Sequence, residues 1–177
     1  MRKTLLMLLA LLTVFAHAQE TYKLELTKST LQISGTSTVS DWVVNAESIS
    51  GDLSTNRQEI TSLELLVPVA NIKSERGPTM DNKMHAALKK EAHPTVKFVL
   101  ENHDDASVIL GNLTIAGVTN PVEIPVDFKV ENEWLNITGK KPIMLKDFEM
   151  EPPSAMFGQI VVGEEVFVIF DLYYSKD

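Results

Sequence analysis

Histidines and paired carboxylates are the side chains of this sequence that could support catalysis or hold a metal ion. Beyond residue 18 the histidines are His85, His93 and His103, and their spacing gives no reason to expect convergence on one point. The pairs Asp104-Asp105 and Glu164-Glu165 fall in predicted turns, where adjacent side chains usually face solvent. Motifs for nucleophilic serine, zinc-peptidase, phosphate-loop or dinucleotide chemistry do not occur. We therefore expect no enzyme, no metal site and no built-in cofactor.

Charge and composition exclude further classes of protein. Asp and Glu number 24 against 16 Lys and Arg, the formal net charge is -8, and basic runs are at most two residues long. This argues against nucleic-acid binding and against electrostatic docking on anionic lipid. Hydrophobic residues make up 44% of the 177 residues, so a packed core is expected. Without cysteine, the fold must be held by packing and strand pairing alone.

The first 18 residues have the pattern of an export signal. Arg2 and Lys3 precede an apolar run from Leu5 to Ala16, and small residues at 16 and 18 flank His17. The run is about 12 residues long, too short for the ~20 that span a bilayer. We predict cleavage before Gln19 and a periplasmic or secreted mature chain without an integral membrane segment.

In the rest of the chain, apolar residues occur at every second position of several segments. This is the pattern of strands that have one apolar face and one face toward solvent. Such runs are Leu63 to Val69, Val96 to Leu100, Val122 to Val130 and Val166 to Leu172. Turn residues separate them, at 50–52, 102–105, 119–121, 131–132, Gly139, 151–153 and Gly163. We predict a single all-β domain over 19–177, with eight to ten strands in a barrel or sandwich.

One segment, Thr79 to Glu91, has helical rather than strand spacing. Met80, Met84 and Leu88 recur every four residues and would form one stripe. His93-Pro94 stops the pattern, because the residue before proline avoids the α region. The helix either closes one end of a barrel or covers a sheet edge, and the pattern does not decide between these.

The stretch Gly111 to Val122 predicts a hairpin, with a strand through Leu113 and Ile115, a turn from Gly117 to Asn120, and a strand beginning at Pro121. It resembles the signature G-x-L-T-I-x-G-V-T-x-P-V of the YceI-like family of exported, lipocalin-like, polyisoprenoid-binding proteins. Pro94 with its alternating strand, and Gly163 leading into the last strand, resemble further family features. In place of the family's Arg-Asp-x-His-Leu-Arg-Ser segment the chain has residues 80–86, which keep Asp81 and an apolar residue at Met84 and leave the mouth altered.

The resemblance implies an antiparallel barrel of eight strands around a long apolar cavity. Period-two spacing shows which residues face inward, but it does not show whether the barrel is hollow or filled. The candidate ligand-binding residues are strand residues that are expected to face inward, together with one residue of the helical stripe. They are Trp42, Leu65, Val67, Met84, Phe98, Leu113, Ile115, Val126, Phe128 and Phe170. Methionines and phenylalanines between Met144 and Phe157 suit either an adaptable mouth or plain gap-filling.

Three functional classes follow. The first is an exported protein that sequesters or carries a polyisoprenoid or similar long apolar lipid, the only bound group expected. The second is a filled barrel that acts as a scaffold or envelope stress protein through protein contacts. The third is an enzyme, which no constellation of residues supports. The apolar ligand is the expected partner, and a homodimer is left open.

Overall fold

The computed structural model describes residues 19–56, 59–105, 107–131 and 133–177. The predicted export signal, residues 1–18, lies outside the described residues. Strands dominate, in agreement with the predicted all-β class: β1 (Glu20–Leu24), β2 (Thr30–Ser37), β3 (Trp42–Ala46), β4 (Asp52–Asn56), β5 (Glu59–Pro68), β6 (Ile72–Ser74), β7 (Thr95–Asp105), β8 (Val108–Ile115), β9 (Val118–Glu131), β10 (Trp134–Met144), β11 (Ser154–Ala155) and β12 (Ile160–Lys176). The helix α1 (Pro78–Ala87) and the 3-10 turns η1 (Val69–Asn71) and η2 (Leu145–Phe148) complete the chain.

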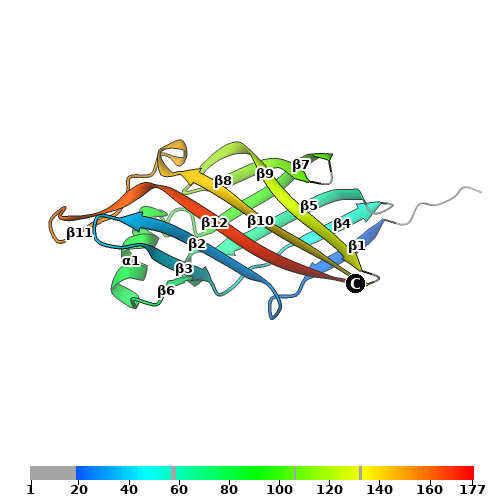
Figure 1. Cartoon of the computed structure of the whole chain (residues 1–177), viewed down its shortest axis with the longest axis horizontal. Coiled ribbons are helices and arrows are strands. Elements are labelled where there is room, and N and C mark those ends of the chain that lie inside the picture. The colour runs from blue at the N-terminus through cyan, green and yellow to red at the C-terminus, as the bar shows by residue number, and fades with distance from the viewer. Residues whose placement is uncertain (1–18, 57–58, 106, 132) are drawn as a thin grey trace, which may run out of the picture.

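Eight strands close into an antiparallel barrel. The ring runs β1-β4-β5-β7-β8-β9-β10-β12 and returns to β1, because Leu24 pairs with Tyr174 and Tyr22 with Lys176. Neighbouring strands in this ring run antiparallel throughout (Figure 1). The predicted eight-stranded barrel is thereby confirmed.

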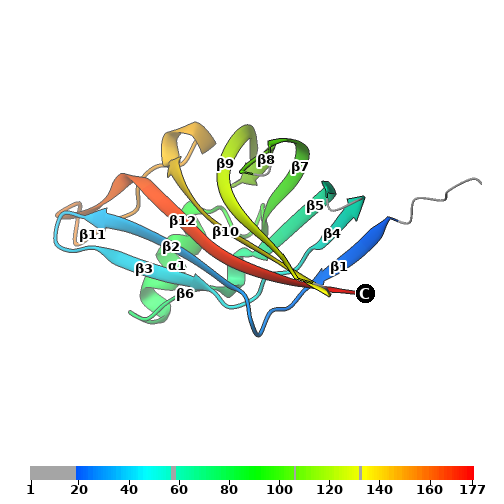
Figure 2. The ribbon, with the colours of Figure 1, turned by 45° about the vertical axis from the view of Figure 1, so that its right-hand side comes forward.

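One end of the barrel is splayed open by a fork in strand pairing along β12. Its last residues pair with β1, whereas its earlier part, Val162 to Asp171, pairs with β2. β2 continues into β3 and β3 into β6, so a three-stranded flap extends the wall on that side. α1 follows β6 directly and lies beside it, at the open end in both ribbon views (Figures 1 and 2).

α1 ends at Ala87, four residues before the predicted end at Glu91. Lys89 has a φ of 54°, and the Lys89 and Lys90 amides donate to the carbonyls of Ala86 and His85. This is a Schellman termination, which usually uses glycine at the left-handed position. Because lysine occupies that position here, the sequence carried no signal for the stop.

Four predicted turns are wrong, since residues 102–105, 119–121, Gly139 and Gly163 lie inside β7, β9, β10 and β12. Bulges absorb the breaks in β7 and β12, where the register shifts after Leu100, His103 and Val162. In β9, Pro121 lies on a stretch that pairs with β8 alone, because the pairing of β9 with β10 covers only Val126 to Glu131. A missing amide is tolerated on such a free strand edge.

The predicted hairpin turn is confirmed and is tighter than expected. Ile115 pairs with Val118, which leaves only Ala116 and Gly117 between the strands. Their φ values are 50° and 87°, as a two-residue type I′ turn requires. Gly117 is needed there for a second reason, because a Cβ at this position would meet the ring of His93.

The core fills the narrow end of the barrel. Fully buried side chains from four barrel strands meet there, among them Tyr22, Leu53, Leu135 and Tyr174. The Tyr174 hydroxyl is buried without a hydrogen-bond partner among the described residues, and burial raises the pKa of this phenol. A second cluster, from Ile115, Phe148 and Val166 among others, packs beneath η2 toward the wide end.

Candidate ligand cavity

A cavity of about 260 Å³ lies inside the wide end of the barrel. Its wall comes from β2, β3 and β6, from α1, and from the inward residues of β5, β7, β8, β9, β10 and β12. An apolar cavity of about 150 Å³ is large enough for benzene, and typical small-molecule sites begin near 300 Å³. The space therefore suits one slender chain rather than a bulky molecule.

Eight of the ten predicted residues line this cavity: Trp42, Leu65, Val67, Met84, Phe98, Leu113, Ile115 and Phe170. They come from six different elements, so the alternation in the sequence does bring them together around one space. That they bind a ligand remains a prediction.

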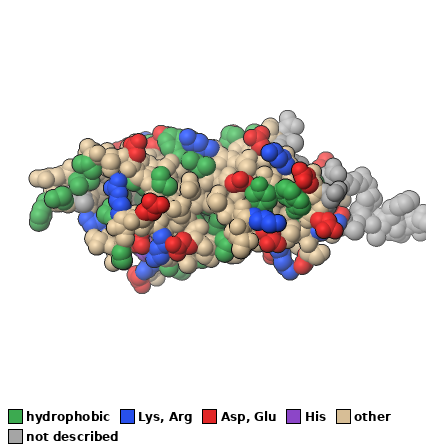
Figure 3. All heavy atoms as spheres, turned by 60° about the horizontal axis from the view of Figure 1, so that its bottom comes forward, with side chains coloured by type: hydrophobic (Ala, Val, Ile, Leu, Met, Phe, Trp, Pro, Cys, Tyr) green, Lys and Arg blue, Asp and Glu red, His purple; other side chains and the backbone are tan. Residues whose placement is uncertain are grey.

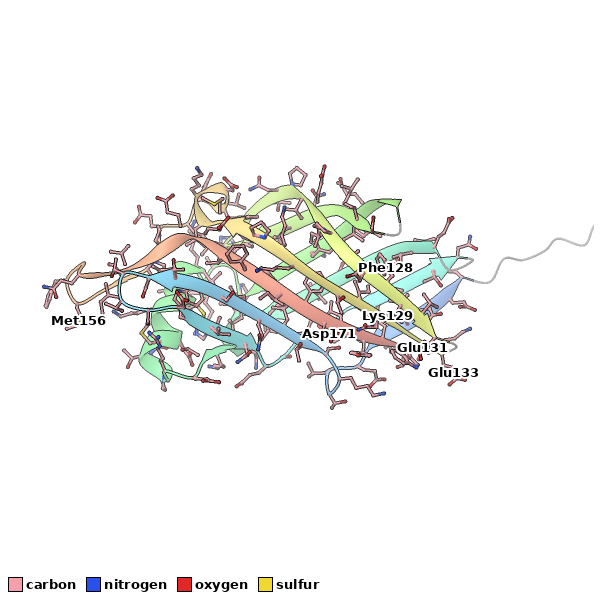
Figure 4. All side chains as sticks on the ribbon, viewed as in Figure 1. Phe128, Lys129, Glu131, Glu133, Met156 and Asp171 are labelled. Atoms are coloured by element: carbon pink, nitrogen blue, oxygen red, sulfur yellow. The ribbon has the colours of Figure 1, made fainter. Side chains whose placement is uncertain are left out.

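Val126 and Phe128 do not line the cavity, although they share the inward parity of Ile124. Val126 is buried in the main core cluster and Phe128 packs against it, in the filled narrow end. Figure 4 shows Phe128 far along the barrel from Met156, which marks the wide end. Val126 and Phe128 were wrongly predicted to line the cavity because β9 is long enough to run past it into the filled half of the barrel. Every second residue of the strand faces inward in both halves, so alternation alone does not tell them apart.

Glycines in the wall keep the cavity open beside large aromatic rings. A Cβ on each of three wall glycines would collide with a ring that lies across it: Gly35 with Trp42, Gly111 with Phe98, and Gly139 with Phe170. Because each ring lies against bare backbone, it leaves more of the lumen free than it would over a side chain.

α1 contributes the predicted stripe to the cavity, since Met80, Met84 and Leu88 all line it. An adjacent side of the helix, about 100° around its axis from the stripe, is held to β6 by two buried polar groups. His85 Nε2 lies 2.9 Å from the Ile72 carbonyl oxygen, and the Asp81 carboxylate accepts a 2.7 Å hydrogen bond from the Ser74 amide. These anchors fix the helix along the free edge of β6, the last strand in the sheet order. The helix therefore covers a sheet edge and also forms a wall of the cavity at the wide end, so the two roles weighed for it are combined.

The cavity opens toward solvent between α1, the β2–β3 turn and β11. Arg76 and Ser154, two solvent-exposed residues of the lining, are both located there. Arg76 Nη2 donates to Ser40 Oγ at 2.9 Å, and Lys83 Nζ donates to the Ser154 carbonyl at 3.3 Å. Hydrogen bonds thus connect the three segments that surround the mouth.

Apolar side chains project into solvent beside this mouth. Phe157 is fully exposed and Met156 is 64% exposed, in the loop between β11 and β12, and Val39 is exposed in the β2–β3 turn. The two loops are joined by a 3.1 Å hydrogen bond from the Thr38 hydroxyl to the Gln159 carbonyl. Figure 3 shows hydrophobic side chains at the tip of this end. Of the late methionines and phenylalanines, Met150 lines the cavity and Phe148 is fully packed.

The residues first weighed for catalysis do not assemble into a site in the part of the chain described. His85 is a structural anchor, and the ring of His93 lies against the Gly117 turn. Glu164 and Glu165 are both exposed in β12. Between residues 19 and 177, the described acidic and histidine side chains form no group of three that could hold a metal ion.

Several lining residues were missed by the sequence reasoning. Leu31 and Ile33 alternate within Thr30–Ser37, and this spacing was a usable signal. Ile72 gave none, because β6 has only three residues. Lys141 also lines the cavity, and the expectation of a turn at Gly139 concealed its place on a strand.

An eight-stranded antiparallel barrel has room for one small ligand where side chains do not fill its interior, and here an apolar cavity with one open end remains. The YceI-like domain matches residues 22–174, and the chain belongs to this family. No curated protein sequence matches the chain.

Three solved structures share the fold. BcnA of Burkholderia cenocepacia has a TM-score of 0.69 at 19% identity, with 85% of this chain and 98% of that chain covered. A polyisoprenoid-binding domain from Saccharophagus degradans, implicated in plant cell wall breakdown, has a TM-score of 0.69 at 12% identity, covering 88% and 98%. The YCEI protein of Campylobacter jejuni has a TM-score of 0.63 at 16% identity, covering 76% and 84%. Within the described residues, the helices are too short or too polar to cross a bilayer.

Proposed function

We propose that this protein is an exported binding protein that holds one long apolar lipid chain, such as a polyisoprenoid, in the cavity of its barrel. The observation that carries the proposal is the cavity itself, which is lined almost wholly by apolar side chains and has an opening at one end. Family membership and the polyisoprenoid-binding neighbour support a binding role rather than catalysis.

The energetics favour a carrier or buffer over an extractor. Burying one five-carbon isoprene unit from water stabilises by about 3–4 kcal/mol. A polyisoprenoid starts in a membrane, however, where its chain is already out of water. Transfer into the barrel is then close to neutral in hydrophobic terms, so loading follows the local supply of lipid.

The exposed tip supports exchange at an apolar phase. Met156, Phe157 and Val39 lie beside the mouth, and exposed apolar groups of this kind commonly mark contact sites. A lipid that leaves a bilayer next to this tip would cross little water before it reached the cavity. The predicted signal at residues 1–18 would place the protein in the periplasm or outside the cell.

The test is native mass spectrometry of the protein purified from its own envelope without detergent. We expect a species heavier than the processed chain that starts at Gln19, by the mass of one lipid, and expect organic extraction to remove the extra mass. A clean unliganded mass under gentle conditions, with failure to take up an added isoprenoid, would overturn the proposal and favour the scaffold role.

A further inference from the structure

Lys141 is an inward-facing cation in a mostly apolar wall. On β10 the inward positions are Leu135, Ile137, Gly139, Lys141 and Ile143, and the neighbouring Lys140 and Pro142 are exposed. Lys141 is half-buried and lines the cavity. The residues aligned with it across the sheet all line the cavity as well, in the order Lys141, Val168, Ile33, Val44 and Ser74.

No anion compensates this charge within the described part of the chain. Lys141 Nζ makes none of the ion pairs or lysine hydrogen bonds found there. The charged residues of the lining are Arg76, Lys83 and Lys141, all cationic, in a chain where acidic residues outnumber basic ones 24 to 16. Arg76 and Lys83 are engaged at the rim by Ser40 and Ser154, so Lys141 is the cation left for a ligand.

A cation in an apolar wall is costly unless it is hydrated or paired. A purely hydrocarbon ligand would displace water from the Lys141 amine and would not replace the lost hydrogen bonds. We propose that the ligand carries an anionic head group, a carboxylate or a phosphate, which pairs with Lys141 while its apolar chain fills the deeper cavity. This rests on the proposed function and specifies its ligand class.

The position of Lys141 sets the direction of the ligand. Ile143 and Val166 lie one inward row nearer the mouth, and Phe170 and Leu172 lie deeper. From Val168 to Leu172 the strand rises about 14 Å at ~3.4 Å per residue. An extended chain of about twelve carbons has this length at roughly 1.3 Å per bond. The tail therefore enters first and the anion stays toward the mouth, where Arg76 and Lys83 add positive charge.

Matched pairs of ligands test this on the delipidated full-length mature chain. Farnesol is compared with farnesyl phosphate, and dodecanol with dodecanoate, by displacement of the neutral dye Nile red at pH 8. Within each pair the chain is the same and only the head group differs. We expect the parent to bind at least one anion about tenfold or more tightly than its alcohol, as charge-assisted hydrogen bonds imply. Whichever pair shows the larger ratio identifies phosphate or carboxylate as the head group.

Two variants locate the effect. Lys141→Met keeps most of the length of the side chain without its charge and should reduce the anion-to-alcohol ratio to about one, with alcohol binding retained. Lys140→Met removes the neighbouring charge, whose Nζ lies over the Phe167 ring outside the barrel, and should keep the parent ratio. Equal binding of alcohol and anion by the parent, or an unchanged ratio in Lys141→Met, overturns the head-group inference and leaves lipid binding intact. Failure of all four ligands to bind overturns both.

Discussion

Two leucines distinguish the filled half of the barrel from the hollow half. Leu53, on β4, is 0% exposed and does not line the cavity, whereas Leu31, on β2, is 7% exposed and does. Both belong to the main core cluster. Leu→Ala at each site removes the same atoms, so a difference in stability reports what surrounds them.

Leu53→Ala should cost about 4–5 kcal/mol of unfolding free energy. The lost transfer energy is about 2 kcal/mol, and a residual void near 100 Å³ adds about 2.4 at ~24 cal/mol per Å³. Leu31→Ala should cost about 2–3 kcal/mol, because one side of Leu31 already faces empty space and has fewer contacts to lose.

Urea denaturation of the delipidated variants measures both costs, with an unchanged m-value as the check that unfolding remains two-state. Costs that agree within about 0.5 kcal/mol would show that Leu31 is as tightly packed as Leu53. In that case the wide end is not hollow in solution, and the reasoning fails.

Three further changes have defined outcomes. Gly117→Ala should destabilise by more than about 1 kcal/mol, since the new Cβ adds a positive-φ penalty and meets the His93 ring. Because 1 kcal/mol lowers the Tm of a domain of this size by roughly 2–4 °C, a Tm within about 2 °C of the parent would contradict this. His85→Ala should leave the Ile72 carbonyl unpaired at a cost of about 1–3 kcal/mol and speed amide exchange in α1; unchanged exchange would show that the helix is held elsewhere. Because burial raises the pKa of Tyr174, the folded state keeps its proton above pH ~10 while the unfolded state loses it. The free energy of unfolding should then fall by up to about 1.4 kcal/mol per pH unit above pH 10. Urea denaturation at pH 9.5 and 11 should show a smaller fall for Tyr174→Phe than for the parent. An equal fall in both proteins would refute this.

Much of the fold could be predicted from local patterns, because the patterns and the tertiary structure agree. Leu113 and Ile115 alternate up to a two-residue turn, and Val118 begins the partner strand. The stripe from Met80 to Leu88 also lies on the face expected for a helix packed on an apolar space.

The breaks within long strands could not be predicted, because their signals depend on partners distant in sequence. Gly139 resembles a turn residue until Phe170 on β12 is seen to lie across it. Gly163 is accommodated by a bulge against β2. The end of α1 was misplaced for a similar reason, since Lys89 adopts a conformation that usually belongs to glycine.

The extent of the cavity was beyond sequence reasoning for a geometric reason. The alternation of residues along a strand predicts that Phe98 and Phe128 both face inward. It does not predict where each residue lies along the barrel axis. Phe98 lies where the flap and α1 widen the barrel, and Phe128 lies where β1 and β12 close it. That difference arises from the fork in β12, which is a property of the whole sheet.

Binding to a variant with a filled cavity tests the central claim most directly. Val168 lines the cavity and pairs with Lys141 on the adjacent strand. Its neighbour Ile169 is exposed on the outside of the same strand. Val168→Trp and Ile169→Trp therefore add the same bulk to opposite faces. Titration with a fluorescent isoprenoid analogue should show that folded Val168→Trp binds at least tenfold more weakly than the parent, whereas Ile169→Trp binds like the parent. Parent-like binding by Val168→Trp, or no binding by the parent, would contradict the account.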